Sequence, residues 1–344
     1  MKSGTCRATS MTAKSSVLWP SLGTTCAPLL VIVLVLLTGQ DSRAQSFSYS
    51  SGQNVSPAFE GWEKNPDGSF NLLFGYMNRN WEEEINVPVG PDNNIGPGLA
   101  DQGQPTRFLP RRNRFVFKVR VPSDFGTQEL VWTLATKGKT ERAYATLRPD
   151  YFLDAVTIMS ERGAIGGGFT NPVIRANKAP VLRVEGEKSR SVKNGQSLTL
   201  IAAASDDGVP KLGHPPGAAE NVAPEGQLTA TAASRQPTAP RPPAYSAPRV
   251  GSIPYSAVGL RVVWYVYRGA GKVTFDPPQF KVWEDTRDGA NSPWSPRWTT
   301  PPMPPDGRIM VRATFSEPGD YILRCLADDG GLWAAEEVAV TVIP

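Results

Sequence analysis

Residues 313–342 constrain the fold of this chain more than any other stretch. Polar and apolar residues alternate through its first part, as in a strand with one buried face. The apolar face consists of Tyr321, Leu323, Cys325 and Ala327. Turn-forming residues flank this segment, and residues 337–342 form a second, β-branched segment with the same alternation. Two adjacent antiparallel strands need a second sheet to cover their apolar face, so the sequence predicts a two-layer β structure for the C-terminal half.

Short segments of the C-terminal half occur in a recognisable order. They are KAPV at 178–181, GQSLTL at 195–200, ASDDG at 204–208, Trp264, GKVTF at 271–275 and the stretch described above. In this order they resemble PKD-type, immunoglobulin-like modules of secreted bacterial proteins. The resemblance covers residues 178–343 and implies a β-sandwich there, but no particular activity, because such modules serve many tasks. Two Pro-rich inserts, 209–256 and 277–305, depart from the spacing of that family.

The N-terminal half resembles no family, but its pattern also predicts strands. A Pro-Asp-Gly turn separates two extended segments that together read as a hairpin, and a well-alternating segment covers residues 115–121. Residues 91–112 are expected to form a long irregular loop. The predicted fold class is therefore all-β, with two immunoglobulin-like β-sandwich domains in tandem. The predicted domains are 45–162 and 178–344, joined by a Gly-rich linker at 163–177.

The first 44 residues predict export. A basic start is followed by an apolar run at 27–37, which is short for a membrane span, and small residues at Ser42 and Ala44 suit a signal peptidase. We expect cleavage after Ala44 and a periplasmic or extracellular location, which could be peripheral to the membrane. An uncleaved anchor is the open alternative, because the basic region is long.

Charge and cysteine content argue against nucleic-acid binding and against an intrachain disulfide bond. Lys2, Arg7, Lys14 and Arg43 against Asp41 account for +3 of the formal charge of +4, so the exported part would carry +1. A net charge of +1 is much lower than the strongly basic charge typical of nucleic-acid-binding proteins. Two of the three cysteines lie in the signal segment, so Cys325 would have no intrachain disulfide partner and is predicted to be a small buried residue.

The inventory of catalytic side chains is poor. His214 is the only histidine and lies in a low-complexity insert. A catalytic Ser-His or Cys-His pair would therefore lack a positioned general base, and a zinc site would lack its usual ligands. Glu60, Glu63 and Asp101 are the carboxylates that a hydrolase could use, but no spacing indicates that two of them face each other. The sequence thus predicts a protein that is not an enzyme.

Four aspartates form the first candidate site. In an antiparallel sandwich, the strands that end near residues 204 and 327 run toward the same end, together with both inserts and the linker. The residues gathered there would be Asp206, Asp207, Asp328 and Asp329. Their hard oxygen ligands suit calcium, which is the one candidate cofactor. The alternative is that each Asp-Asp-Gly is a turn closed by its own aspartates.

Two further groups are candidates for binding a partner. Tryptophans in the second insert, which are Trp283, Trp294 and Trp298, could offer flat faces to a sugar or a protein, or could pack the insert onto a domain. Arginines at the end of the long loop, which are Arg107, Arg111, Arg112 and Arg114, could bind an anionic partner. The alternative for the arginines is a solvated surface, or neutralisation by the acidic run at 82–84.

Together these features predict an exported, non-enzymatic binding or scaffolding protein that meets its partner at the loop-rich end of the C-terminal domain. One version is a membrane-extrinsic structural subunit of a protein complex of the cell envelope. The alternative of another class is a carbohydrate-binding accessory module or a carbohydrate-active enzyme, whose partner would be a polysaccharide.

Overall fold

The computed structural model of this chain describes residues 49–162, 172–210, 258–283 and 300–344. These residues lie in one compact unit, Ser48–Pro344. The predicted signal segment, residues 163–171 of the predicted linker and most of both Pro-rich inserts lie outside the described residues. Where the chain is described, no helix combines the length and the apolar character that a membrane crossing requires.

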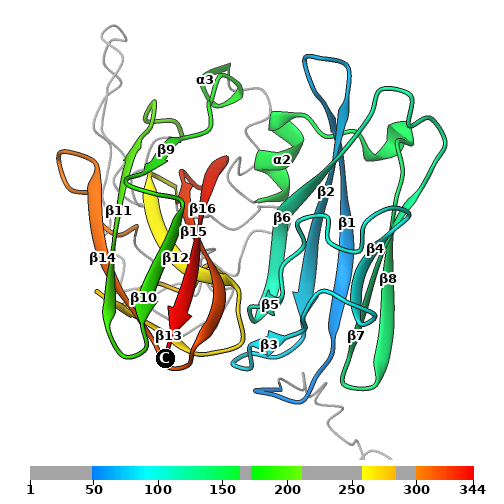
Figure 1. The fold of residues 1–344 in the computed structure, drawn as a ribbon. Helices are drawn as coiled ribbons and strands as arrows, with labels where there is room; N and C mark the ends of the chain where they lie inside the picture. Colours follow the sequence, from blue (N-terminus) through cyan, green and yellow to red (C-terminus); the bar gives the residue numbers. More distant parts are fainter. Residues whose placement is uncertain (1–48, 163–171, 211–257, 284–299) are drawn as a thin grey trace, which may run out of the picture. The chain divides into compact units, whose positions relative to one another are not determined.

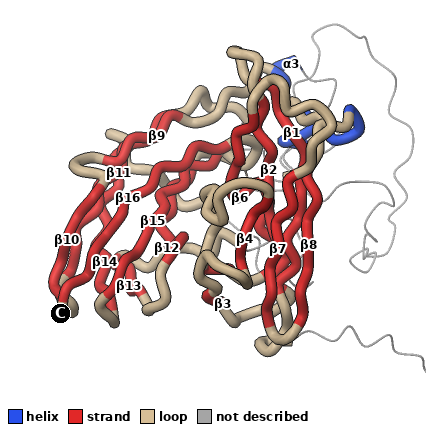
Figure 2. The backbone as a smooth tube through the Cα atoms, turned by 45° about the vertical axis from the view of Figure 1, so that its right-hand side comes forward, coloured by secondary structure: helices blue, strands red, loops and turns tan. Residues whose placement is uncertain are grey.

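The N-terminal half folds into two facing three-stranded sheets (Figure 1). One sheet has the order β1 (Val55–Lys64), β2 (Phe70–Asn78), β6 (Arg111–Val121), and the other β4 (Asn93–Gly96), β7 (Leu130–Thr136), β8 (Lys139–Ala145). Two short strands pair with each other, β3 (Ile85–Asn86) and β5 (Arg107–Phe108). The 3-10 helix η1 (Pro149–Tyr151) and helix α2 (Ala155–Glu161) follow. Helix α3 (Pro172–Arg175) precedes the second half, so helices are few and short (Figure 2).

Aromatic side chains centre the core of this first sandwich. Trp132 is fully buried and meets Phe74 and Phe117 edge-on, at 6.0 and 5.0 Å between ring centroids. Its indole Nε1 donates to Asn93 Oδ1 over 3.0 Å, so the buried donor is satisfied. The predicted hairpin is present as β1 and β2, joined through the Pro-Asp-Gly turn.

The expectation of an irregular loop at 91–112 is wrong in part, because β4 and β5 lie within it. Hydrogen bonds from buried amide side chains, rather than an alternating hydrophobic pattern, hold these strands in place. Asn93 Nδ2 donates to the carbonyls of Val87 and Pro105, and Gln104 Nε2 donates to those of Asn93 and Ala100. A hydrophobicity pattern does not record such side chain–backbone bonds, and the strands were therefore missed.

The second half is a sandwich of two four-stranded sheets. One has the order β13 (Val273–Asp276), β14 (Arg308–Phe315), β11 (Ser197–Ser205), β9 (Val181–Val184). The other has the order β10 (Ser189–Lys193), β16 (Trp333–Ile343), β15 (Gly319–Asp328), β12 (Arg261–Arg268). The pairs are antiparallel except β10 with β16, which is parallel. This is the immunoglobulin arrangement, with its first strand divided between the sheets as β9 and β10.

Two further details agree with an immunoglobulin-like module. Tyr321, at the start of β15, donates its hydroxyl to the carbonyl of Glu317 over 2.8 Å, as in a tyrosine corner. Trp264 on β12 lies opposite Cys325 on β15, and both are buried in the core. The predicted inward face of β15 is confirmed, since all four of its apolar residues are at most 3% exposed. The all-β, tandem-sandwich fold class is therefore confirmed.

Candidate functional site

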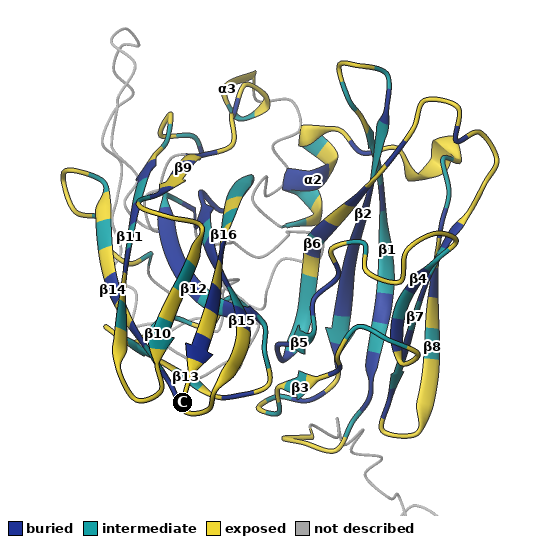
Figure 3. Cartoon of the chain, viewed as in Figure 1, coloured by how far each residue is buried: buried dark blue, intermediate teal, exposed yellow. Residues whose placement is uncertain are grey.

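Strand β12 is buried on both of its faces. Its inward residues lie in the core of the second sandwich, but the outward residues Val263 and Tyr267 are also only 1% and 2% exposed. Figure 3 shows the strand as buried along most of its length. The cover on its outer side comes from the first sandwich. We call the contacts of β12, β15 and β16 with residues 101–116 and 158–162 the inter-sandwich interface.

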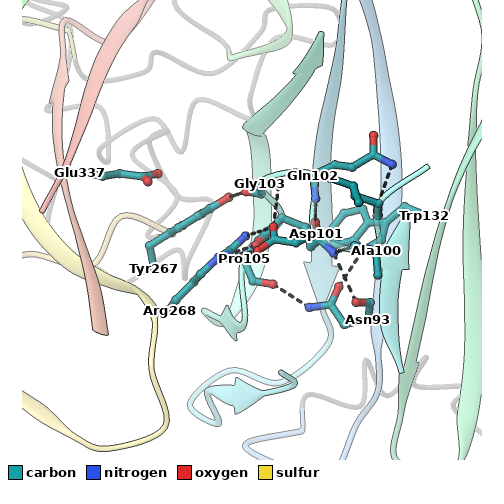
Figure 4. Close-up of polar contacts among 12 residues, drawn as sticks. Asn93, Ala100, Asp101, Gln102, Gly103, Pro105, Trp132, Tyr267, Arg268 and Glu337 are labelled. Atoms are coloured by element: carbon teal, nitrogen blue, oxygen red, sulfur yellow. Dashed lines mark hydrogen bonds and ion pairs between the residues drawn. The ribbon is translucent and has the colours of Figure 1, made fainter. Parts of the chain in front are cut away.

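At one end of this interface, residues 101–106 dock against the end of β12 (Figure 4). The guanidinium of Arg268 donates to both carboxylate oxygens of Asp101 over 2.8 Å, and its Nε donates to the carbonyl of Gln104 over 2.9 Å. The hydroxyl of Tyr267 donates to the carbonyl of Gly103 over 2.5 Å. The hydrogen bonds from Arg268 lower the pKa of Asp101 to about 2, so this pair is ionised over the ordinary pH range.

Arg107 fastens the same end. Its Nε pairs with Glu84 over 2.6 Å, and its Nη1 donates to the carbonyls of Ala270 and Gly271 over 3.0 and 3.1 Å. The acceptors belong to the turn after β12, so the arginine connects the two halves of the chain. A side chain that the sequence marks as a candidate for an anionic partner is therefore held by an intramolecular set of acceptors.

Arg324 occupies the middle of the interface. It lies on the outward face of β15 and is only 7% exposed. Its Nη1 donates to the carbonyl of Val116 on β6 over 2.5 Å, while Nε and Nη2 donate to the carboxylate of Glu337. Its guanidinium carbon stands 3.4 Å from the ring centroid of Tyr267. Since β6 is an edge strand, Arg324 caps a backbone carbonyl that the sheet leaves open.

The other end of the interface combines apolar and ionic contacts. Phe115 and Trp333 stack with 5.5 Å between ring centroids, beside Ile158 of α2. Asp328 is 7% exposed and pairs with Arg162, the C-cap residue of α2, and with Arg261 at 3.2 Å. Burial would raise the pKa of Asp328, but the two guanidinium groups outweigh it and lower that pKa below its ordinary value.

Adjacent residues connect the two acidic turns. Asn177 donates its side-chain amide to Asp329 over 3.1 Å, and the backbone N–H of Lys178 donates to Asp207 over 3.2 Å. Both turns therefore lie at the same end of the second sandwich. Each aspartate also caps its own turn, as Asp206 does for Gly208 and Asp329 for Gly331. Among the described residues, no group of three or more His, Cys, Asp or Glu is arranged to hold a metal, and calcium binding stays a prediction.

Asp329 should give the protein a recognisable dependence of stability on pH. Burial raises its pKa to about 6, so between about pH 4 and pH 6 the folded protein holds a proton that the unfolded chain releases. The free energy of unfolding should therefore fall through this group as the pH rises across that window. In the variant Asp329→Asn, the side-chain oxygen would accept the same bonds from Gly331 and Leu332 without titrating. Urea unfolding at several pH values should show a flatter profile for this variant, and an unchanged slope would contradict the assignment.

The other candidate arginines also have partners within the chain. Arg112 pairs with Glu60 at 2.8 Å and Arg114 with Glu161 at 2.6 Å, while Arg111 lies over the ring of Trp81 at 3.9 Å. Of the candidate tryptophans, Trp283 is half-buried, and Trp294 and Trp298 lie outside the described residues. For both groups, binding to an external partner stays a prediction.

Sequence reasoning missed the residues that form the centre of the interface, namely Tyr267, Arg268 and Arg324. A usable signal exists, because residues 262–267 are apolar or aromatic at every position. A continuous apolar run indicates a strand buried on both faces, whereas alternation indicates one buried face.

Comparisons with known proteins add a fold likeness only. No protein-family model and no curated protein matches the chain. Among solved structures it is similar to the D0-D1 domain of intimin, at 11% identity over 83% of this chain and 98% of that one, with a TM-score of 0.21. Domains 4 and 5 of the S-layer protein SbsC are 9% identical over 85% and 98%, with a TM-score of 0.19. The I67-I69 fragment of titin is 9% identical over 84% and 64%, with a TM-score of 0.19. Function therefore has to be argued from the geometry of this chain.

Proposed function

We propose that this protein is an exported, non-enzymatic scaffold in which two β-sandwiches act as one rigid body that holds a partner in the cell envelope. The observation that carries the proposal is the inter-sandwich interface with Arg324 at its centre. A tandem of sandwiches that moved independently would not need a buried guanidinium bonded to both halves.

The energetics of the interface support rigidity. Interfaces between domains of one chain are usually polar and permit relative motion. This one combines an aromatic stack, the Arg162–Asp328 ion pair between the two halves and the bidentate Arg268–Asp101 pair. Bidentate and buried charged contacts are directional, so a small rotation between the sandwiches would break several of them together. A fixed geometry suits a spacer or clamp that sets the distance between other molecules.

The chemistry of the side chains supports a binding role over catalysis. The polar groups in the inter-sandwich interface bond to each other rather than converge on an open cavity, and Asp101 and Asp328 are held as ion-paired carboxylates. A general acid or base needs a pKa near the working pH and access to a substrate. The carboxylate that titrates near pH 6, Asp329, is fully buried and accepts three hydrogen bonds.

Two measurements test this proposal. Backbone ¹⁵N relaxation of the purified protein should give one rotational correlation time for both sandwiches, and two distinct, shorter times would overturn the rigid-body part. Purification from the membrane fraction of the native cells should bring down a protein complex in fixed stoichiometry. Retention on a polysaccharide column, lost in Trp294→Ala or Trp298→Ala, would instead favour the carbohydrate-binding alternative.

A further inference from the structure

Strand β10 offers one unpaired edge. It pairs in parallel with β16, where Lys188 accepts from the N–H of Ala339 over 2.8 Å and Asn194 donates to the carbonyl of Ile343 over 2.7 Å. This register directs the backbone groups of alternate residues, Arg190 and Val192, toward β16. The N–H and C=O groups of Ser189, Ser191 and Lys193 consequently point away from the sheet. No described strand pairs with that side of β10.

An open hollow of about 620 Å³ runs along this edge. Glu187, Ser189 and Ser191 line it together with Thr341 of β16, and Leu198 of β11 gives it a partly buried apolar floor. Arg190 spans the hollow and donates to the carbonyl of Thr199 over 2.9 Å. The chain crosses from one sheet to the other at residues 185–188, and this crossing leaves the hollow between β10 and β11.

The charges on residues 187–193 themselves are mostly positive. Lys188, Arg190 and Lys193 stand within this short segment against the single acidic residue Glu187. Lys188 pairs with Glu336, whereas Lys193 is exposed and forms no ion pair with a described residue. In the register with β16, Lys193 shares the outer face of the sheet with Ser189 and Ser191.

We infer that the unpaired edge of β10 binds an extended, acidic segment of a partner protein, which adds to the sheet as a further strand. Backbone groups of Ser189, Ser191 and Lys193 would supply the hydrogen bonds, as in strand addition to an exposed sheet edge. One face of the added strand would place apolar side chains on Leu198, and the other would place carboxylates near Lys193. The inference deepens the proposed binding role and rests on it for the existence of a protein partner.

A second copy of this chain is a poorer occupant of the same edge. A two-fold pairing of β10 with itself, centred on Ser191, would bring two strands with a net positive charge together. It would also place the two Arg190 side chains diagonally across the new pair, within reach of each other. Charge complementarity therefore favours an acidic strand over self-association.

Selection from a displayed library of random peptides of about ten residues tests the inference. The bait is the whole protein, and Ser191→Pro removes the outward N–H without removing a bond to β16, a position where an edge strand tolerates proline. Enriched peptides should alternate apolar and acidic residues, and a synthetic copy should bind Ser191→Pro about tenfold more weakly, as expected for a lost main-chain bond. Ser191→Thr is the matched control and should bind like the wild type. Matching unfolding temperatures would show that both variants fold.

Several outcomes would overturn the inference. Enriched peptides without acidic residues, or with equal affinity for the wild type and Ser191→Pro, would remove the edge as the binding surface. A failure to enrich any peptide, or a dimer in sedimentation that Ser191→Pro abolishes, would do the same. Lys193→Glu should weaken binding, and the affinity of the wild type should fall with added salt. None of these outcomes bears on the correlation times of the two sandwiches, so this inference and the rigid-body proposal can fail separately.

Discussion

Replacing Arg324 by leucine is expected to destabilise the protein by about 2–4 kcal/mol and to loosen the two sandwiches from each other. The leucine would leave the carbonyl of Val116 and the carboxylate of Glu337 without their donor. It would also remove the cation that lies on the ring of Tyr267. Glu337 keeps partial contact with solvent, since its side chain is 41% exposed, which limits the loss relative to a fully buried pair.

Urea unfolding and ¹⁵N relaxation together would measure this effect. The midpoint should fall in Arg324→Leu, and the two sandwiches should acquire separate correlation times. Arg324→Lys is the matched control: it retains the charge but lacks the planar fork that reaches Val116 and Glu337 together, so an intermediate loss is expected. A leucine variant with wild-type stability and a single correlation time would show that Arg324 does not hold the interface.

Periodicity was sufficient to predict the layers of each sandwich. The inward residues of β15 could be assigned because strict alternation with one wholly apolar face indicates a strand that packs on a hydrophobic core. Trp264 could be placed in the core for the same reason, and it is 1% exposed. The order of short segments then gave an immunoglobulin-like topology for the second half, which the tyrosine corner at Tyr321 supports.

The inter-sandwich interface could not be derived from that pattern. On the outer face of β15 the sequence shows Arg324 among apolar residues, which reads equally well as a solvated face. Whether this face is solvated or covered depends on the surface that packs against it. That surface is built from segments more than 150 residues away in the sequence, such as 101–107 and 115–116. The continuous apolar run at 262–267 was the one local sign that this sheet has cover on both faces.

Candidate residues chosen for their charge turned out to have intramolecular partners. Arg107 and Asp328 are the kinds of residue that bind anions and metals at a surface, and the sequence contains no record of the oppositely charged group that each meets. A buried charge requires a partner of opposite charge or hydrogen-bonding groups. A charged residue near a domain junction can therefore either join the two halves or bind a ligand. Geometry, rather than residue type, separates these two roles.

Replacing Asp328 by asparagine should cost about 3–5 kcal/mol at neutral pH, because it removes a buried carboxylate that is ion-paired with the partly buried Arg162 and the buried Arg261. Arg162 comes from the end of α2 and Arg261 from β12, so Asp328 joins both halves of the chain through one carboxylate. Its lowered pKa means that this stabilisation is present above the ordinary pKa of an aspartate and is lost as the pH falls through the lower value of the folded state.

The difference in unfolding free energy between the wild type and Asp328→Asn should therefore be largest near pH 7. It should shrink below about pH 4, where the unfolded wild type takes up a proton on Asp328 that the folded protein still excludes. Urea unfolding across this range measures it. Asp206→Asn is the matched control at the same end of the sandwich, because the bond that the Asp206 side chain accepts comes from the backbone of its own turn, at Gly208. An equal loss in the two variants would indicate that turn capping, rather than the bridge between Arg162 and Arg261, is what Asp328 contributes. A loss confined to Asp328→Asn, and dependent on pH in this sense, would locate that contribution in the junction of the two sandwiches.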